Sequence, residues 1–209
     1  MIIEVLTEGA SDVPVIREIL IRHFELTEHE DFHIRPHRGR GNIPNDIHAP
    51  ANPKRRGLLD QLPAKLRGYG RFMNEDFLVL VLIDADNDNP TELHERLNEM
   101  LANITIRPPR VLFRIAVEET ESWFLADRNA LKKGIPKTNL ALLQNIEADQ
   151  IVGAWEKIAE SIGKDKKAVT GSDKHYWAEK IAPFLDFNAP YSPSLSNLIS
   201  GIDAEIKLQ

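Results

Sequence analysis

A run of seven apolar residues, FLVLVLI from Phe77 to Ile83, constrains the fold of this chain most strongly. The run is mostly branched or aromatic, and charged or turn-forming residues stand on both sides of it, which is typical of a strand buried on both faces of a parallel sheet. Asp84, Asp86 and Asp88 follow directly. Open α/β sheets bind ligands beyond the carboxyl ends of their strands, so these carboxylates indicate a site for a hard divalent cation, Mg²⁺ or Mn²⁺.

Two other interpretations of this acidic segment stay open. A segment rich in aspartate before a proline is also an ordinary solvated turn. The spacing of Asp84, Asp86, Asp88 and Glu95 also follows a calcium-binding loop. That match is poor, because Asn89 stands where the loop needs glycine and a strand, not a helix, precedes it.

The N-terminal segment predicts a strand, a turn and a helix. Ile2 to Leu6 is short and β-branched, and a helix with Ser11 or Asp12 as its cap is expected to run to about Phe24. Asp12 is therefore interpreted as a helix cap rather than a metal ligand. Parallel strands place Glu8, which follows the first strand, at the same edge of the sheet as the aspartates, although Glu8 is also a plausible surface turn carboxylate.

These residues resemble a known family. Glu8-Gly9, taken together with Asp84-Ala85-Asp86, is similar to the TOPRIM signature of topoisomerases, primases and OLD-type nucleases. The segments TEGASD, LIDADND and AVEETESWFLAD, with a weaker echo at Ser192-Pro193-Ser194, look like the TOPRIM-like family DUF4276. The resemblance implies a Rossmann-like sheet that holds Mg²⁺ on Glu8, Asp84 and Asp86, and phosphodiester chemistry.

Residues 33–57 form a different kind of segment, rich in Gly, Pro and Asn and without apolar periodicity, which predicts a long loop. The loop is basic although the whole chain has a formal net charge of -6. Loops of this length are usually functional or disordered. The alternatives are a solvated insertion and an arm that grips phosphates through four arginines, Arg38, Arg40, Arg55 and Arg56.

The remaining sequence completes an alternation of strands and helices. Helices are expected from Leu58 to about Phe72 and from Thr91, and a strand from Val111 to Val117. Three glutamates follow this strand within four residues. They suit the positive end of a helix dipole, while the resemblance favours Glu121 as a further metal or supporting ligand.

From residue 131 onward the pattern changes to short helical pieces, over Leu140–Ile146, Ile151–Ile162, Lys174–Leu185 and Ser194–Ile206. We therefore expect an α/β domain over 1–130, Rossmann-like and TOPRIM-like, with a parallel sheet flanked by helices, and a C-terminal α-helical extension over 131–209. Lys174 near a helix start suggests an anion site. OLD-type relatives use a C-terminal lysine near the metals, so the resemblance makes Lys174 the candidate here.

Composition and motifs limit the function. The chain has no cysteine, which excludes disulfides and thiolate catalysis, and no apolar run long enough to span a membrane, so a cytoplasmic location is expected. The interpretation is Mg²⁺- or Mn²⁺-dependent phosphodiester hydrolysis of DNA or RNA. Its catalytic residues are Glu8, Asp84, Asp86 and Lys174, and Asp88 and Glu121 are further metal candidates.

The chain has no ATPase motif. The resemblance therefore suggests an ABC-type ATPase partner and a role in phage defence. Two alternatives stay open: a non-catalytic TOPRIM-like interaction module, and a HAD-like or receiver-like phosphoryl-transfer enzyme.

Overall fold

The computed structural model describes residues 1–147 and 149–208. Its centre is one parallel sheet with the strand order β2-β1-β3-β4. The strands are β1 (Ile2–Thr7), β2 (Phe32–Pro36), β3 (Phe77–Asp84) and β4 (Val111–Ala116). The predicted buried strand is confirmed as β3, which pairs with β1 on one side and β4 on the other.

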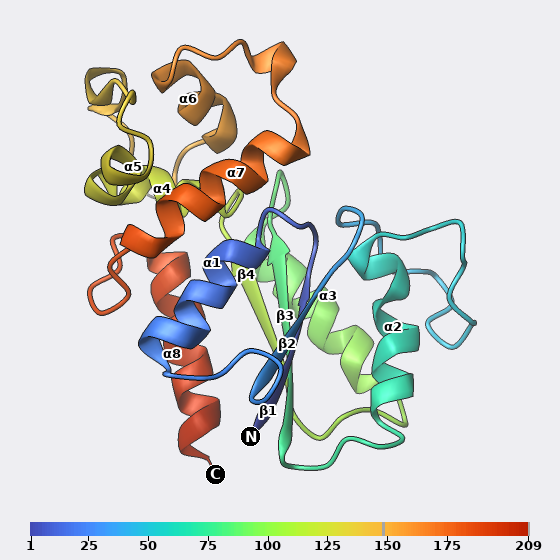
Figure 1. The fold of residues 1–209 in the computed structure, drawn as a ribbon. Helices are drawn as coiled ribbons and strands as arrows, with labels where there is room; N and C mark the ends of the chain where they lie inside the picture. The colour runs from blue at the N-terminus through green and yellow to red at the C-terminus, as the bar shows by residue number, and fades with distance from the viewer. Residues whose placement is uncertain (148, 209) are drawn as a thin grey trace.

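Helices cover both faces of the sheet (Figure 1). On one face lie α1 (Val13–Glu18), which continues as a π-helical turn η1 (Ile19–His23), and α8 (Pro193–Lys207). The opposite face carries α2 (Leu58–Tyr69) and α3 (Pro90–Ala102). The sheet is therefore the middle layer of an α/β fold, as the alternating sequence pattern predicted.

The alternation of side chains along β1 and β3 explains these layers, because successive residues of a strand point to opposite faces. Ile3 of β1 and Leu78 of β3 belong to the core shared with α1 and α8. Leu6 and Val79 belong to the core shared with α2 and α3. Both groups are fully buried, so the apolar run from Phe77 fills two cores at once.

The C-terminal helices form a cap above the carboxyl ends of the strands (Figure 1). They are α4 (Glu121–Ala126), α5 (Arg128–Gly134), η2 (Leu140–Leu143), α6 (Ala154–Ser161), η3 (Lys166–Ala168), α7 (Gly171–Ile181) and η4 (Ala182–Phe184). Their buried residues share one continuous core with α1 and one sheet face. No helix within 1–147 and 149–208 is long and apolar enough to cross a membrane.

Three helix boundaries differ from the sequence predictions. The helix expected over Lys174–Leu185 begins at Gly171, after a capping box formed by Thr170 and Asp173, and ends at Ile181. The helix expected over Ile151–Ile162 begins only at Ala154, because Gly153 has a positive φ of 79° that breaks a right-handed helix. The helix expected over Leu140–Ile146 is a single 3₁₀ turn that begins after Asn139, whose side chain accepts from the Ala141 amide.

The segment Ser192–Ser194, noted for its sequence, is a structural junction. Ser192 caps α8 by accepting from the Leu195 amide. The Trp123 indole donates to the Ser194 hydroxyl at 2.8 Å, and Asp149 accepts from both serines. Trp123 is buried here and belongs to the core.

Candidate active site

The ends of β1 and β3 bring two predicted residues together. Asp84 is the last residue of β3, and Glu8 follows β1, its parallel neighbour. The Asp84 backbone amide donates to Glu8 Oε1 at 2.9 Å. The two carboxylates therefore lie at one edge of the sheet, as the parallel arrangement required.

Asp12 joins them from the turn between β1 and α1. It is 3% exposed, and its side chain does not cap α1 as the sequence suggested. Instead, Asp12 Oδ2 accepts from the Gly9 amide at 3.0 Å and Oδ1 accepts from the Thr120 hydroxyl at 3.1 Å. The turn holds Asp12 inward, toward the start of α4.

The start of α4 supplies two more carboxylates, and α7 supplies their counter-ion. Lys174, from α7, places Nζ 3.0 Å from Glu119 Oε1 and 3.6 Å from Glu121 Oε1. The same ammonium lies 5.1 Å from the centroid of the Trp155 ring of α6, a cation–π contact. Lys174 is thus held between acids and an aromatic ring at the floor of the cap.

Glu8, Asp12, Asp84, Glu119 and Glu121 make up what we call the carboxylate cluster. Burial, the largest cause in each case, raises the pKa of Glu8 to about 8, of Glu119 to about 7 and of Asp12 to about 6. Burial and then the charges of Asp12 and Glu8 raise the pKa of Asp84 well above its ordinary value. Acids this close retain protons unless a cation replaces them.

The pKa of Lys174 is raised. Burial alone would lower it, but the charges of Glu121 and Glu119 outweigh burial. Lys174 therefore stays an ammonium and supplies one positive charge to the carboxylate cluster. Glu121 also has a raised pKa, from burial opposed by Lys174.

The structure places Asp86 and Asp88 at the rim of the cluster. Arg40 Nη1 lies 3.3 Å from Asp86 Oδ2 and donates to the Ala85 carbonyl at 3.2 Å, and Arg40 Nη2 pairs with Asp88. The charge of Asp86 still raises the pKa of Glu8. Arg40 is only 16% exposed, so its terminal nitrogens serve the aspartates rather than a free phosphate.

Left-handed backbone marks the junction of the β3 and β4 loops. Asp86 and Glu118 have φ values of 48° and 65°, which non-glycine residues rarely adopt, and the Asp86 amide donates to the Glu118 carbonyl at 2.9 Å. The Glu118 carboxylate accepts from the Gly153 and Ala154 amides at 2.7 and 3.1 Å, at the start of α6. Glu118 thus ties the cap to the sheet, and such strain collects at functional sites.

The donor set of the carboxylate cluster fits a hard cation. All its ligand atoms are carboxylate oxygens, which suit Mg²⁺ or Mn²⁺. Within the described residues, the buried Glu119 Oε2 has no hydrogen-bond partner.

The side chains of the carboxylate cluster do not converge on one point. In residues 1–147 and 149–208, no group of three or more His, Asp or Glu side chains is arranged to hold a metal ion. Binding would therefore require side-chain rotation.

The basic loop has a defined path beside the site. The Gly39 amide of the loop donates to the Glu8 backbone carbonyl at 2.9 Å, and the Leu58 amide at the start of α2 donates to the Gly39 carbonyl. Arg38, Arg55 and Arg56 are exposed. Arg40, in contrast, points inward, so three of the four arginines predicted to contact nucleic acid face solvent.

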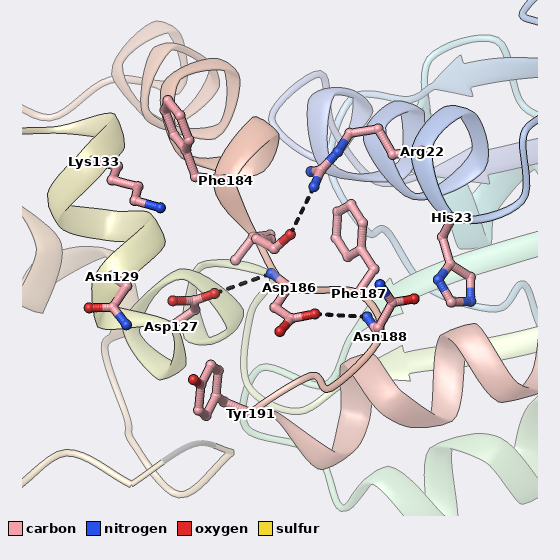
Figure 2. Close-up of a pocket in the computed structure, with 11 residues that line it drawn as sticks. Arg22, His23, Asp127, Asn129, Lys133, Phe184, Asp186, Phe187, Asn188 and Tyr191 are labelled. Carbon is pink, nitrogen blue, oxygen red and sulfur yellow. Dashed lines mark hydrogen bonds between the residues drawn. The ribbon is translucent and has the colours of Figure 1, made fainter.

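A separate cavity of about 360 Å³ lies between η1, α5 and the segment after η4 (Figure 2). Its lining residues include Arg22, Asp127, Asp186 and Tyr191. Arg22 donates to two backbone carbonyls, and Asp127 accepts from the Ala130 and Asp186 amides. These polar groups are used to hold the fold, and the cavity shares no residue with the carboxylate cluster.

Sequence reasoning missed Asp12 and Glu119 as members of the cluster. Asp12 satisfies the pattern of a helix cap, and Glu119 is one of three glutamates within four residues. Only the folded structure brings the two residues together, because Thr120, which directly follows Glu119, donates to Asp12 over a long sequence separation.

Comparison with known proteins assigns this chain to a family. A comparison with the curated proteins finds no match. Two solved chains match, both the C-terminal region of the Xanthomonas campestris pv. campestris OLD protein, phased with mercury in one and with platinum in the other. Each is 13% identical with a TM-score of 0.49, and the match covers 98% of this chain and 96% or 94% of the other. The model of the family described as "Domain of unknown function (DUF4276)" matches residues 7–199, and the chain belongs to this family.

Proposed function

We propose that this protein is a Mg²⁺- or Mn²⁺-dependent phosphodiesterase, nuclease-like and of the TOPRIM type, that acts on nucleic acid. The carboxylate cluster carries the proposal. It gathers acids from the ends of β1 and β3 and the start of α4 around one ammonium. No structural role of the sheet requires so many buried acids in one place, because buried charges are costly unless they are paired or bind metal.

Glu8 and Asp84 would hold the metal, with Glu121 as a further ligand and Asp86 entering from the rim. The bound ion would supply an activated water and stabilise charge on the phosphate. The other roles would fall to side chains of the protein. Lys174 Nζ, oriented by Glu119 and Trp155, would donate to a phosphate oxygen as negative charge develops there. Arg40 would neutralise Asp86 and Asp88 until substrate or metal replaces it.

The test is cleavage of single- and double-stranded DNA and RNA with Mg²⁺ or Mn²⁺, each compared with EDTA. Metal-dependent cleavage supports the proposal. A stable beryllofluoride complex without cleavage would instead favour the phosphoryl-transfer alternative. An ATPase partner and a role in phage defence remain part of the proposal, and adding a co-purified ATPase to the same assay tests the partner.

We expect the basic loop to contribute to substrate binding. Replacing Arg38, Arg55 and Arg56 with glutamine should weaken binding of an oligonucleotide and flatten its salt dependence, by about 0.7 to 0.9 in log–log slope for each phosphate that the variant no longer neutralises. Fluorescence anisotropy over a salt series measures both effects. Arg40 is left unchanged, since its loss would free Asp86 and Asp88. Unchanged affinity and slope would make the loop an insertion that does not touch substrate.

A further inference from the structure

A second basic feature runs along β2, on the face of the sheet that α2 covers. Among the strands of the described residues, β2 pairs only with β1, so it is an edge strand. His33 and Arg35 lie opposite Glu4 and Leu6 in the register of the two strands, and Leu6 faces α2. His37 follows at the same spacing of two.

Glu4 of β1 organises this group from the inside. It is 7% exposed and accepts from Arg35 Nε at 2.9 Å and from the Tyr69 hydroxyl of α2 at 3.0 Å. His33 Nδ1 lies 3.9 Å from its other oxygen. Lys65, one helical turn before Tyr69, lies close enough for its charge to interact with Glu4 and Arg35. One buried carboxylate therefore faces a guanidinium and an ammonium.

Both cations have unused donors. Arg35 is 54% exposed, and among the described residues only its Nε is bonded, which leaves its terminal nitrogens open. Lys65 is half-buried, and its Nζ has no hydrogen bond or ion pair among those residues. Burial lowers the pKa of Lys65, Glu4 opposes this and Arg35 adds to it. The Lys65 ammonium is half-buried beside the Arg35 guanidinium, and the two cations share a single acid, Glu4. This arrangement is suited to binding an anion from outside the protein.

The group leads toward the carboxylate cluster. The five residues from His33 to His37 are separated by four steps of extended backbone, which span roughly 13 Å. At the end of this path the His37 amide donates to the Thr7 carbonyl at 3.0 Å, and Thr7 directly precedes Glu8. An anionic chain lying along β2 would therefore reach the site at Glu8.

We propose that His33, Arg35, His37 and Lys65, here called the β2 row, bind the phosphate backbone of a nucleic acid strand and direct it to the carboxylate cluster. Delivery of the strand to the carboxylate cluster rests on the proposed function, but binding of the strand by the β2 row does not. Contacts of this kind, in which Arg35 and Lys65 supply the charge, position a strand without reading its bases. Binding by the β2 row should therefore be independent of sequence and strongly dependent on salt.

Lys65→Gln tests the β2 row, because Lys65 bonds to no other described residue and its loss should leave the fold intact. We expect weaker binding of a labelled oligonucleotide in EDTA, with the log–log salt slope reduced by about 0.7 to 0.9 for the one phosphate that Lys65 neutralises. Lys65→Arg should restore the slope. The matched control is Lys137→Gln, which removes an exposed lysine that follows α5 in the sequence. Helix α5 lies on the other side of the molecule from α2 (Figure 1). Equal melting temperatures of the three variants confirm their folding.

Two outcomes separate this inference from the proposed function. If Lys65→Gln binds like Lys137→Gln and wild type, the β2 row is overturned, even if the protein cleaves the small ester bis(p-nitrophenyl) phosphate with Mn²⁺. If Lys65→Gln weakens binding but wild type cleaves neither nucleic acid nor the ester, the β2 row stands and the phosphodiesterase proposal fails.

Discussion

Asp84→Asn is expected to reduce Mn²⁺-dependent cleavage by more than about 100-fold, since partners that merely orient metal ligands are already worth 10- to 100-fold. Asparagine nearly preserves the shape of the side chain but removes an anionic ligand beside Glu8. The metal-free protein should keep or gain stability, by about 1 kcal/mol, because the neutral amide can be buried beside Asp12 and Glu8 without taking up a proton. The rise in melting temperature that Mn²⁺ gives to wild type should be much smaller in the variant.

Asp76→Asn is the matched control. Asp76 is exposed and directly precedes β3, at the opposite end of the strand from Asp84. It should leave both cleavage and the Mn²⁺ response unchanged. If Asp84 only tied a turn, its replacement would instead cost about 1 kcal/mol with no metal-linked change. A wild type that neither gains stability from Mn²⁺ nor cuts any substrate would remove the enzyme interpretation and favour the interaction module.

The metal-free protein should lose stability as pH rises from about 5 to about 8. The pKa of Glu8, ordinarily 4.5, is about 8 in the folded protein, and that of Glu119 is about 7. In this window the folded state binds more protons than the unfolded chain, so the free energy of unfolding falls by about 1.4 kcal/mol per pH unit for each such group. The contribution of Glu119 should level off above about pH 7 and that of Glu8 above about pH 8.

His37 works in the opposite direction, because burial lowers its pKa and its neutral form is favoured on folding. Saturating Mn²⁺ should remove most of the decline, since the ion replaces the protons and binds more tightly as pH rises. Urea unfolding at several pH values, with EDTA or with Mn²⁺, measures how the free energy of unfolding depends on pH without and with the metal. Glu8→Gln should flatten the EDTA profile, whereas Glu75→Gln, at an exposed position, should not. A metal-free profile that does not fall across this range would contradict the raised pKa of Glu8.

Much of the fold follows from local sequence patterns. The run from Phe77 predicts a strand buried on both faces because every position is apolar, and β3 confirms this. The adjacency of Glu8 and Asp84 follows from one topological rule, that parallel strands end at the same edge. Residues next to strand ends are therefore the part of the site that a single sequence predicts well.

The rest of the site depends on packing between distant segments. Nothing near Asp12 in the sequence indicates that Thr120 will draw it away from the helix it was predicted to cap. Arg40 was grouped with the other loop arginines by composition, and only the folded loop shows that it turns inward to the aspartates. Lys174 was suggested by the resemblance, but its contacts with Glu119 and Trp155 require α4, α6 and α7 to be assembled.

The position of Lys174 has a consequence for how this protein is made. During synthesis Glu8 and Asp84 leave the ribosome long before the α7 lysine and before α8, whose residues complete the core under β4. A nascent chain therefore carries acids without their ammonium, on a sheet that lacks one of its covering helices. The proposed phosphodiesterase activity should therefore arise only after α7 and α8 have both left the ribosome.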